Sequence, residues 1–510
     1  MTREPIRSIL VVGGGTAGWM TASVLSRVFA PERLAITVVE SEEIGIVGVG
    51  EATVPLLQQL HGLLGIDERE FLKATNGTYK LGIEFRDWAR IGDVFFHGFG
   101  DYGAEMLGVQ PHHFWLKLRQ LGDDTALDDY SLPYAIARRG RFAIPPRGEE
   151  NPASFFAHAF HFDASLYGRF LRGYADARGV RRIEGKIVDV ALRKEDGFID
   201  QVTLDDGRQL GADLYVDCSG FRGLLIEQAL ETGYVDWHQW LPCDSALAVP
   251  SEVTAAPTPY TRSTAQKAGW QWRIPLQHRI GNGHVYCSRY MDDDTAEAQL
   301  LAGLDAPALA APRRLRFVTG RRKLAWNRNV VALGLASGFI EPLESTSIHL
   351  VQQGVSTLMS LFPSGTIEPA EVAQYNRLIR RDYEQVRDFV ILHYKQTLRR
   401  DTPFWRDVAA MDVPQRLAER ISLFEAHGRV FLEPGELFTE TSWVAVMLGQ
   451  GLNPRGFDLQ ARNLPEEQVR EQLRRMAALI RRGAEVMPSH AEFLTGPRKA
   501  PPVDQLWNRI

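Results

Sequence analysis

The first forty residues contain the pattern that most constrains the fold of this chain. The apolar segment Ser8 to Val12 runs directly into the glycine-rich turn GGGTAG at residues 13–18. Residues 16–29 then have helical character, and the apolar, β-branched segment Leu34 to Glu40 ends in an acid. Strand, glycine turn, helix and strand in this order are typical of a βαβ unit in a parallel sheet. The chain is therefore predicted to begin with a Rossmann-like α/β core.

The glycine spacing indicates a dinucleotide cofactor. Gly13 allows the tight turn, Gly15 lets the backbone approach a pyrophosphate, and Gly18 lets helix and strand pack closely. Backbone N–H groups at the start of the helix bind phosphate, and an acid about 20 residues further on accepts ribose hydroxyls. The cofactor contacts predicted in this unit are Gly13, Gly15, Thr16, Ala17, Gly18 and Glu40. The alternative is a glycine turn in a βα unit that binds no nucleotide.

Two later segments favour FAD over NAD. Residues 213–220 (DLYVDCSG) form a predicted strand that ends in small residues. Residues 329–338 (NVVALGLASG) form a predicted strand followed by a glycine-bearing turn. Each segment alone is compatible with an ordinary core strand, and it is their order after the N-terminal glycine turn that favours FAD.

Composition excludes several classes of protein and partner. Lys and Arg total 58 and Asp and Glu 63, so the formal net charge of −5 gives no global field for nucleic acid. No stretch approaches the roughly 18 continuous apolar residues of a membrane span. The cysteines Cys218, Cys243 and Cys287 form no CxxC pair, which favours a reducing compartment. We expect a cytoplasmic protein with no membrane or nucleic-acid partner.

The order of predicted elements indicates two parts. Strands are expected at 186–193, 198–204, 209–216, 270–275, 283–290, 314–323 and 330–335, and helices at 369–398, 414–427, 441–448 and 465–482. We predict an FAD-binding core over residues 1–360 that resembles flavin monooxygenases. Its inserted sheet comes from roughly 80–185 and 235–325, and a glycine-rich strap lies at 45–55. A mainly helical C-terminal module follows at 361–510.

Five segments together carry a resemblance to a known family. They are the glycine turn with Trp19-Met20, GVGEATVP at 48–55, YKLG at 79–82, WQWRIP at 270–275 and EPLEST at 341–346. On these motifs the sequence resembles a flavin-dependent halogenase of the tryptophan halogenase family. The WxWxIP signature separates such halogenases from related monooxygenases, so the resemblance is more specific than the glycine turn alone.

The resemblance implies a reaction and its reactants. FADH2 from a separate flavin reductase, with O2, would oxidise chloride or bromide to hypohalous acid, which then halogenates an electron-rich aromatic of the indole type. Lys80 matches the family's catalytic lysine, Glu344 its essential glutamate and Ser345 the neighbouring serine. An FAD-dependent aromatic monooxygenase (hydroxylase) and a non-catalytic flavoprotein are the alternatives. Both a monomer and a homodimer are compatible with the sequence.

The resemblance also assigns further positions. FAD contacts are implied at Gly48, Gly50, Glu51, Val188, Leu335 and Ile348. The backbone amides of Thr346 and Ser347 would bind the halide, where the family often has glycine at the second position. The substrate pocket is expected to include His97, Phe99 and Trp443, and the signature residues are Trp270, Trp272 and Pro275.

The chemistry explains why such residues are needed. Hypohalous acid is small and reactive, so a closed path must keep it from water. The Lys80 ammonium can hydrogen-bond this acid, or its neutral amine can form a haloamine. Attack on an aromatic carbon gives a cationic intermediate, which the Glu344 carboxylate would stabilise and deprotonate. Trp270 and Trp272 lie on one face of a predicted strand and could separate the flavin from the substrate.

Two absences complete the prediction. The tandem His112-His113 and the spaced His158 and His161 lack HExxH spacing or cysteine companions, so no metal site is expected. Free-tryptophan halogenases hold the amino acid with a tyrosine pair and a downstream glutamate, and the segment 442–451 (SWVAVMLGQG) offers neither. We therefore expect free tryptophan to be a poor substrate.

Overall fold

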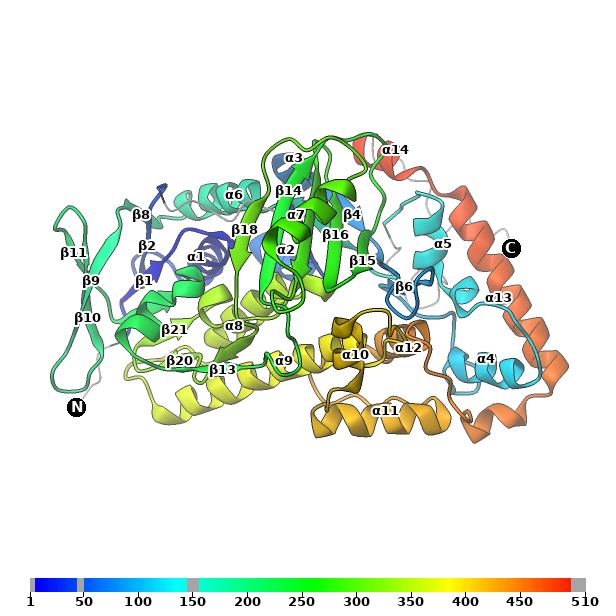
Figure 1. Cartoon of the computed structure of the whole chain (residues 1–510). Helices are drawn as coiled ribbons and strands as arrows, with labels where there is room; N and C mark the ends of the chain where they lie inside the picture. The colour runs from blue at the N-terminus through cyan, green and yellow to red at the C-terminus, as the bar shows by residue number, and fades with distance from the viewer. Residues whose placement is uncertain (1–4, 44–49, 145–155, 497–510) are drawn as a thin grey trace. The chain divides into compact units, whose positions relative to one another are not determined.

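The computed structural model describes residues 5–43, 50–144 and 156–496, which divide into two units (Figure 1). Unit 1 comprises Met1–Gly77, Phe162–Asp244 and Leu315–Val386. Unit 2 comprises Thr78–His161, Ser245–Arg314 and Arg387–Ile510. Each unit therefore joins segments that lie far apart in the sequence.

A six-stranded sheet organises unit 1. Its strand order is β20-β21-β12-β1-β2-β8, with bounds Trp326–Asn327, Val330–Ala332, Leu214–Asp217, Ser8–Val12, Ala35–Glu40 and Arg181–Glu184. β1 pairs in parallel with β12 on one side and with β2 on the other, and β20 runs antiparallel to β21. Helix α1 (Thr16–Val28) follows β1, and α6 (Ala164–Asp176) packs beside it. The predicted βαβ unit is confirmed.

Different partners bury the two faces of β1. Leu10 and Val12 belong to a core shared with Val202, from the three-stranded sheet of β11 (Gln209–Gly211), β10 (Ile199–Leu204) and β9 (Ile187–Leu192). Strand alternation puts Val11 on the other face, where its side chain lies 3.5 Å from the position that a Cβ on Gly18 of α1 would take. Burial on both faces explains why this strand is apolar at every position after Ser8.

Shorter elements complete unit 1. The helical ones are α2 (Leu57–Leu64), α3 (Glu68–Thr75), η3 (Gly220–Arg222), η4 (Leu224–Ala229), η5 (Gly334–Ala336), η6 (Pro342–Glu344) and α8 (Ser347–Ser360). The strands are β3 (Gly50–Ala52) and the small sheet of β13 (Tyr234–Asp236), β19 (Gly320–Arg322) and β22 (Gly338–Phe339). The turn η6 leads directly into α8, which places the segment 341–348 at a helix start.

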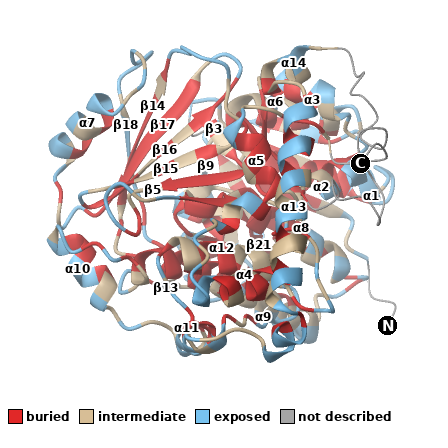
Figure 2. Cartoon of the chain, turned by 90° about the vertical axis from the view of Figure 1, so that its right-hand side faces the viewer, coloured by how far each residue is buried: buried red, intermediate tan, exposed pale blue. Residues whose placement is uncertain are grey.

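A seven-stranded sheet organises unit 2. Its order is β18-β14-β17-β16-β15-β5-β6, with bounds Arg313–Arg316, Ser245–Ser251, Ile280–Tyr286, Gly269–Pro275, Thr261–Gln266, Gly82–Arg86 and Val94–Gly98. Figure 2 shows that β14, β16 and β17 are mostly buried. β16 and β17 pair antiparallel, with Trp272 opposite Gly283, and β17 begins and ends earlier than the strand predicted at 283–290. A Cβ on Gly283 would lie 2.0 Å from the Trp272 ring, so glycine leaves room for this indole.

Two strands and a set of helices complete unit 2. β4 (Thr78–Lys80) and β7 (Ala159–Asp163) pair antiparallel. The helices are α4 (Pro111–Gln120), η1 (Leu127–Tyr130), α5 (Leu132–Arg138), α7 (Asp293–Ala302), α10 (Pro403–Ala410), α11 (Gln415–His427), α12 (Glu440–Gly449), η7 (Leu459–Asn463), α13 (Glu466–Val486) and α14 (His490–Thr495). The long helix α9 (Pro369–Lys395) enters unit 2 from unit 1. The four helices predicted after residue 368 are confirmed as α9, α11, α12 and α13.

Three expectations about organisation differ from the structure. The helices after residue 386 share unit 2 with the sheet, whereas a separate module from 361 was expected. The reason is close packing such as that of α12 on β6, where a Cβ on Gly449 would lie 2.4 Å from the Phe95 ring. The segment 209–216 is two strands, because the chain turns at Asp213, whose carboxylate accepts the N–H groups of Arg7 and Ser8. The segment 314–323 likewise contains β18 and β19, which belong to different sheets.

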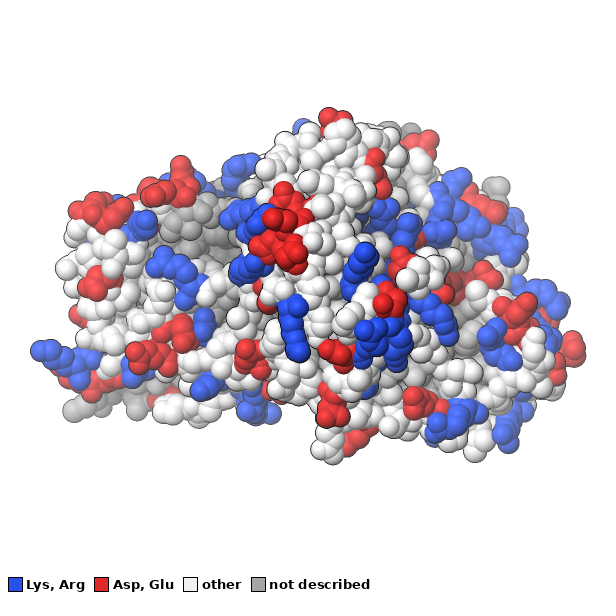
Figure 3. Space-filling model, in the orientation of Figure 1, with Lys and Arg blue, Asp and Glu red and all other residues white. Residues whose placement is uncertain are grey.

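The surface charges, the cysteines and the helices relate to the predicted compartment and partners. On the face seen in Figure 3, Lys and Arg side chains lie interspersed with Asp and Glu. Cys218, Cys243 and Cys287 are all free. In the described ranges no helix combines the length and the apolarity that crossing a bilayer requires.

Candidate active site

The glycine turn of unit 1 has the geometry that a dinucleotide requires. Gly13 has a φ of +111°, and a Cβ there would lie 2.3 Å from the carbonyl oxygen of Cys218. A Cβ on Gly18 would lie 1.8 Å from the carbonyl oxygen of Gly13, so helix and turn touch at this point. A Cβ on Gly15, which caps α1, would meet nothing within 4 Å. Space at Gly15 and the N–H groups at the start of α1 fit a pyrophosphate.

Glu40 lies at the end of β2, beside this turn. Its Oε2 accepts a hydrogen bond from Trp19 Nε1 at 3.2 Å, and its Oε1 is paired with Arg182. A carboxylate has about four lone-pair positions, so these contacts leave capacity for ribose hydroxyls. A Cβ on Gly14 would lie 1.4 Å from Glu40 Oε2, so the second glycine of the turn is also needed. The GxGxxG pattern allows any residue at position 14, so it did not predict that glycine is needed there.

The other implied FAD positions lie in different settings. Gly48 and the first part of the strap, residues 45–49, are outside the described residues, which resume at Gly50 and Glu51 in β3. Burial raises the pKa of Glu51 to about 7. Leu335 and Ile348 are partly or fully buried near the start of α8. Val188 is 61% exposed on β9, so it makes few contacts within the protein itself.

Glu344 is buried in a tight turn before α8. It ends η6 and is 1% exposed. Ser345 follows with a φ of +60°, a left-handed conformation that costs a non-glycine residue free energy and that clusters at functional sites. Glu341, three residues earlier, is also fully buried. Two carboxylates are therefore held in one turn, and the sequence pattern singled out only the second.

The start of α8 has the features of an anion site. Within the described residues, the amides of Thr346 and Ser347 donate no hydrogen bond, and the buried Thr346 hydroxyl has no partner. The first amides of a helix are unpaired and carry partial positive charge, which favours a halide. Ser347 is the first residue of the helix, and the left-handed residue of the turn is Ser345. A serine at 347 therefore meets no torsional obstacle.

Lys80 is fully buried at the end of β4 in unit 2. Its Nζ lies 5.1 Å from the centroid of the Phe99 ring, over its face. The Phe99 amide donates to the carbonyl of Leu81 at 2.8 Å, which ties the two segments together beside the lysine. Phe99 itself is only half-buried. The ammonium and the aromatic face thus occupy one location, as the expected roles of both residues require.

Two histidines hold β4 in place. The ring nitrogens of His161 contact the hydroxyls of Thr78 at 3.0 Å and Thr261 at 2.9 Å, linking β4 to β15. Burial and then the charge of Lys80 lower the pKa of His161 well below its usual value. His490 Nε2 accepts the amide of Tyr79 at 3.2 Å. These neutral rings hold the two residues of β4 that precede Lys80.

Aromatic side chains from four elements meet at His97. The His97 centroid lies 5.6 Å from that of Phe389 and 6.2 Å from that of Phe438. Phe389 and Phe438 stack at 3.7 Å, and Trp443 contacts Phe389 edge to face at 4.8 Å. We call His97, Phe389, Phe438 and Trp443 the aromatic wall. Sequence reasoning missed Phe389 and Phe438, because nothing in their local pattern distinguishes them from core residues of α9 and of the loop before α12.

The signature tryptophans lie as expected on one strand face. Trp270 and Trp272 of β16 are 1% and 9% exposed, with ring centroids 6.0 Å apart. Trp270 also contacts Trp88 at 6.5 Å. Pro275 ends the strand, and its carbonyl accepts the Thr78 hydroxyl at 2.7 Å, which connects the signature segment to β4.

The tandem histidines of α4 have a structural explanation. His112, His113 and Glu440 offer ligand-type atoms within 4.8 Å of one another. His112 Nε2 lies 2.9 Å from the carbonyl of Gly428, and His113 Nδ1 accepts the amide of Asp458 at 3.3 Å. Burial lowers their pKa values to about 3 and about 4. Each neutral ring thus bonds to a backbone group, and the absence of a metal site stays a prediction.

Comparison with known proteins points to one family. The family model described as tryptophan halogenase matches residues 8–466. The tryptophan 6-halogenase SttH of Streptomyces toxytricini is 39% identical over 446 residues, which cover 82% of this chain and 84% of SttH. Two solved flavin-dependent halogenases superpose with TM-scores of 0.93: Xcc4156 of Xanthomonas campestris (47% identical) and BrvH of Brevundimonas sp. BAL3 (46% identical). They cover 96% of this chain, and 98% and 99% of their own.

Proposed function

Because the chain belongs to the tryptophan halogenase family of flavin-dependent enzymes, we propose that it is an FADH2- and O2-dependent halogenase of indole-type aromatics. In this proposal hypohalous acid reaches the substrate through Lys80. The observation that carries it is the placement of the buried Lys80 ammonium 5.1 Å over the half-buried ring of Phe99.

FAD would be held by the glycine turn of unit 1, with Gly15 leaving space for the pyrophosphate and Glu40 facing the ribose. Bound as FADH2, it supplies with O2 the two-electron oxidation of halide to hypohalous acid. The amides of Thr346 and Ser347 would orient chloride or bromide at the start of α8. The partners we propose are a separate flavin reductase and a small aromatic substrate, in the cytoplasm.

Lys80 would hold the hypohalous acid by a hydrogen bond from its ammonium or carry the halogen as a haloamine. Glu344 would stabilise the cationic ring intermediate and accept the proton that leaves the halogenated carbon. His97 and Phe99 would contact the aromatic ring, and Trp270 and Trp272 would keep it from the flavin. The atoms balance, because the ring exchanges a proton for a halogen and hypohalous acid becomes water.

The alternative is an FAD-dependent aromatic hydroxylase. The buried pair Trp270 and Trp272, together with Lys80, favours the halogenase, since direct oxygen transfer needs no lysine relay. The mass of the product of indole, formed with a flavin reductase in the presence and absence of bromide, distinguishes the two. Oxygen incorporation without bromine would exclude the halogenase.

We predict that indole is a better substrate than free tryptophan. The ammonium of a desolvated amino acid needs a carboxylate partner, and an unpaired buried charge costs several kcal/mol. The segment 442–451 offers no acid, and the buried Glu436 before α12 is already paired with Arg420. Without a clamp, attack should fall on C3, the most nucleophilic carbon of indole.

Competition between equal concentrations of indole and tryptophan, with products identified by mass and NMR, measures this preference. Halogenation of tryptophan at one benzo-ring carbon in preference to indole would contradict it. Indole-bearing molecules whose charges stay in solvent serve as the positive control.

A matched pair of glycine variants tests the cofactor site. Gly15→Ala adds a Cβ in open space, so stability should be unchanged while FAD affinity falls, because the pyrophosphate needs that space. Gly18→Ala places its Cβ against the Gly13 carbonyl and should destabilise the fold by about 3 kcal/mol or more. Urea unfolding and FAD titration separate the two effects. Equal loss of stability in both variants would contradict the assignment.

A further inference from the structure

We propose that Arg420 is a positioning residue that fixes the aromatic wall through its ion pair with Glu436 and its stack on Trp443. This rests on the proposed function, in which His97 and Phe99 contact the substrate ring. Arg420 touches neither, so its effect on the substrate would pass through the wall.

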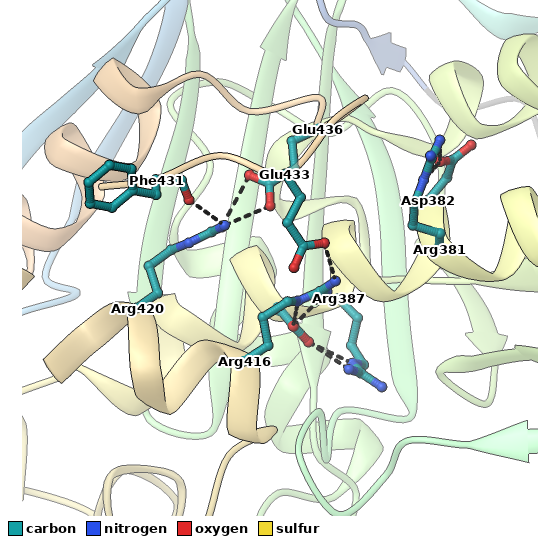
Figure 4. A network of polar contacts seen from close by, with 9 residues as sticks. Arg381, Asp382, Arg387, Arg416, Arg420, Phe431, Glu433 and Glu436 are labelled. Atoms are coloured by element: carbon teal, nitrogen blue, oxygen red, sulfur yellow. Dashed lines mark hydrogen bonds and ion pairs between the residues drawn. The ribbon is translucent and has the colours of Figure 1, made fainter. Parts of the chain in front are cut away.

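The hydrogen bonds of Arg420 fix the orientation of its planar guanidinium group. Its guanidinium binds both carboxylate oxygens of Glu436, at 2.7 and 3.1 Å, and donates to the carbonyl of Phe431 at 2.9 Å. Both side chains of the ion pair are buried, at 8% and 4% exposure. Figure 4 shows Arg420 reaching from α11 to these groups. Such a bidentate arrangement holds the guanidinium in one orientation.

The same guanidinium lies against the wall. Its central carbon is 4.2 Å from the ring centroid of Trp443. The Trp443 N–H is buried and has no hydrogen-bond partner among the described residues. Packing therefore fixes the orientation of this indole, and Arg420 and Phe389 are two of its packing partners. A lysine could keep the charge but not the planar stack.

A second connection runs through Glu436. This residue lies two positions before Phe438, in a stretch from 428 to 439 that has neither helix nor strand. Backbone pairing does not hold such a segment, so its position depends on side-chain contacts. The ion pair is one of its anchors, beside the pair of Arg416 with Glu433. Phe438 in turn stacks on Phe389, which contacts His97. Two chains of contact thus lead from Arg420 to His97.

The test uses the full-length enzyme with FAD, NADH, a flavin reductase and bromide. The double variant Arg420→Met/Glu436→Gln leaves no unpaired buried charge, so it should fold. We expect the KM for indole to rise about tenfold or more, since small misplacements of binding groups have such effects. Bromination of a soluble 1,3-diketone trap, which needs no substrate pocket, should be unchanged. Arg420→Lys should raise KM less.

A matched control is available in unit 2. Arg399 pairs with Asp401 at 2.8 Å and stacks on Trp405 at 4.7 Å, so it has the same kind of contacts as Arg420. The ring contacts of Trp405 are with Trp88, Tyr394 and Phe404, none of which belongs to the aromatic wall. Arg399→Met/Asp401→Asn should therefore leave the KM for indole unchanged. An equal rise in KM in this control would overturn the proposal, because the effect would be general destabilisation.

Calorimetric titration of indole gives a second readout that does not depend on turnover. Weaker binding in the Arg420 variants than in the wild type supports the positioning role. Equal Kd values, or no indole binding by the wild type, would overturn it. Loss of diketone bromination by the wild type would instead overturn the proposed halogenase function.

Discussion

Replacement of Lys80 by alanine is expected to abolish indole halogenation, a loss of at least about a thousandfold, because correct placement of a reactant contributes that much or more. Lys80 is fully buried with its Nζ over the face of Phe99. FAD binding and halide oxidation should persist, since in the proposed sequence the lysine acts after hypohalous acid has formed.

The measurement compares indole bromination with bromination of the diketone trap in the same preparation. Lys80→Met preserves most of the packing and should behave like Lys80→Ala if the amine is what matters. Lys73→Ala, at an exposed lysine of α3, controls for loss of a positive charge. Near-normal indole halogenation by Lys80→Ala would show that the proposed relay is wrong.

Glu344→Gln is expected to reduce the rate of indole halogenation by about 10²–10³, within the range for a positioned general base. The amide is close in shape to the carboxylate, so the turn before α8 should be kept. It cannot accept the ring proton and it stabilises a cation less well. FAD affinity and trap bromination should be close to those of the wild type.

Glu341→Gln is the comparison that the structure supplies. Both acids are buried in one turn, three residues apart. If Glu344 is the base, the loss in Glu341→Gln should be clearly smaller. Equal losses would mean that the turn needs two carboxylates for its structure, and the assignment of the base to Glu344 would fail.

Local patterns predicted much of the fold because they depend on short-range physics. The strand Ser8–Val12 has the bounds expected from its apolar run, and the helices Gln415–His427 and Glu440–Gly449 begin and end within one residue of the predicted segments. The strand predicted at 270–275 is likewise present, as part of β16. The segment 209–216 was less predictable, since the turn at Asp213 depends on backbone groups of Arg7 and Ser8 from the far end of the chain.

The sequence by itself determined the βαβ unit with its glycine turn and the motifs that contain Lys80, Glu344 and Trp270. Within each of these motifs the residues lie a few positions apart, so spacing along the chain records their local geometry. Only the tertiary structure decided that the C-terminal helices share a unit with the sheet, and that Phe389, Phe438 and Arg420 meet around His97 and Trp443. Apolar packing is non-directional, and a phenylalanine of the wall has the same local pattern as one of the core. Such contacts exist only once distant segments have packed together.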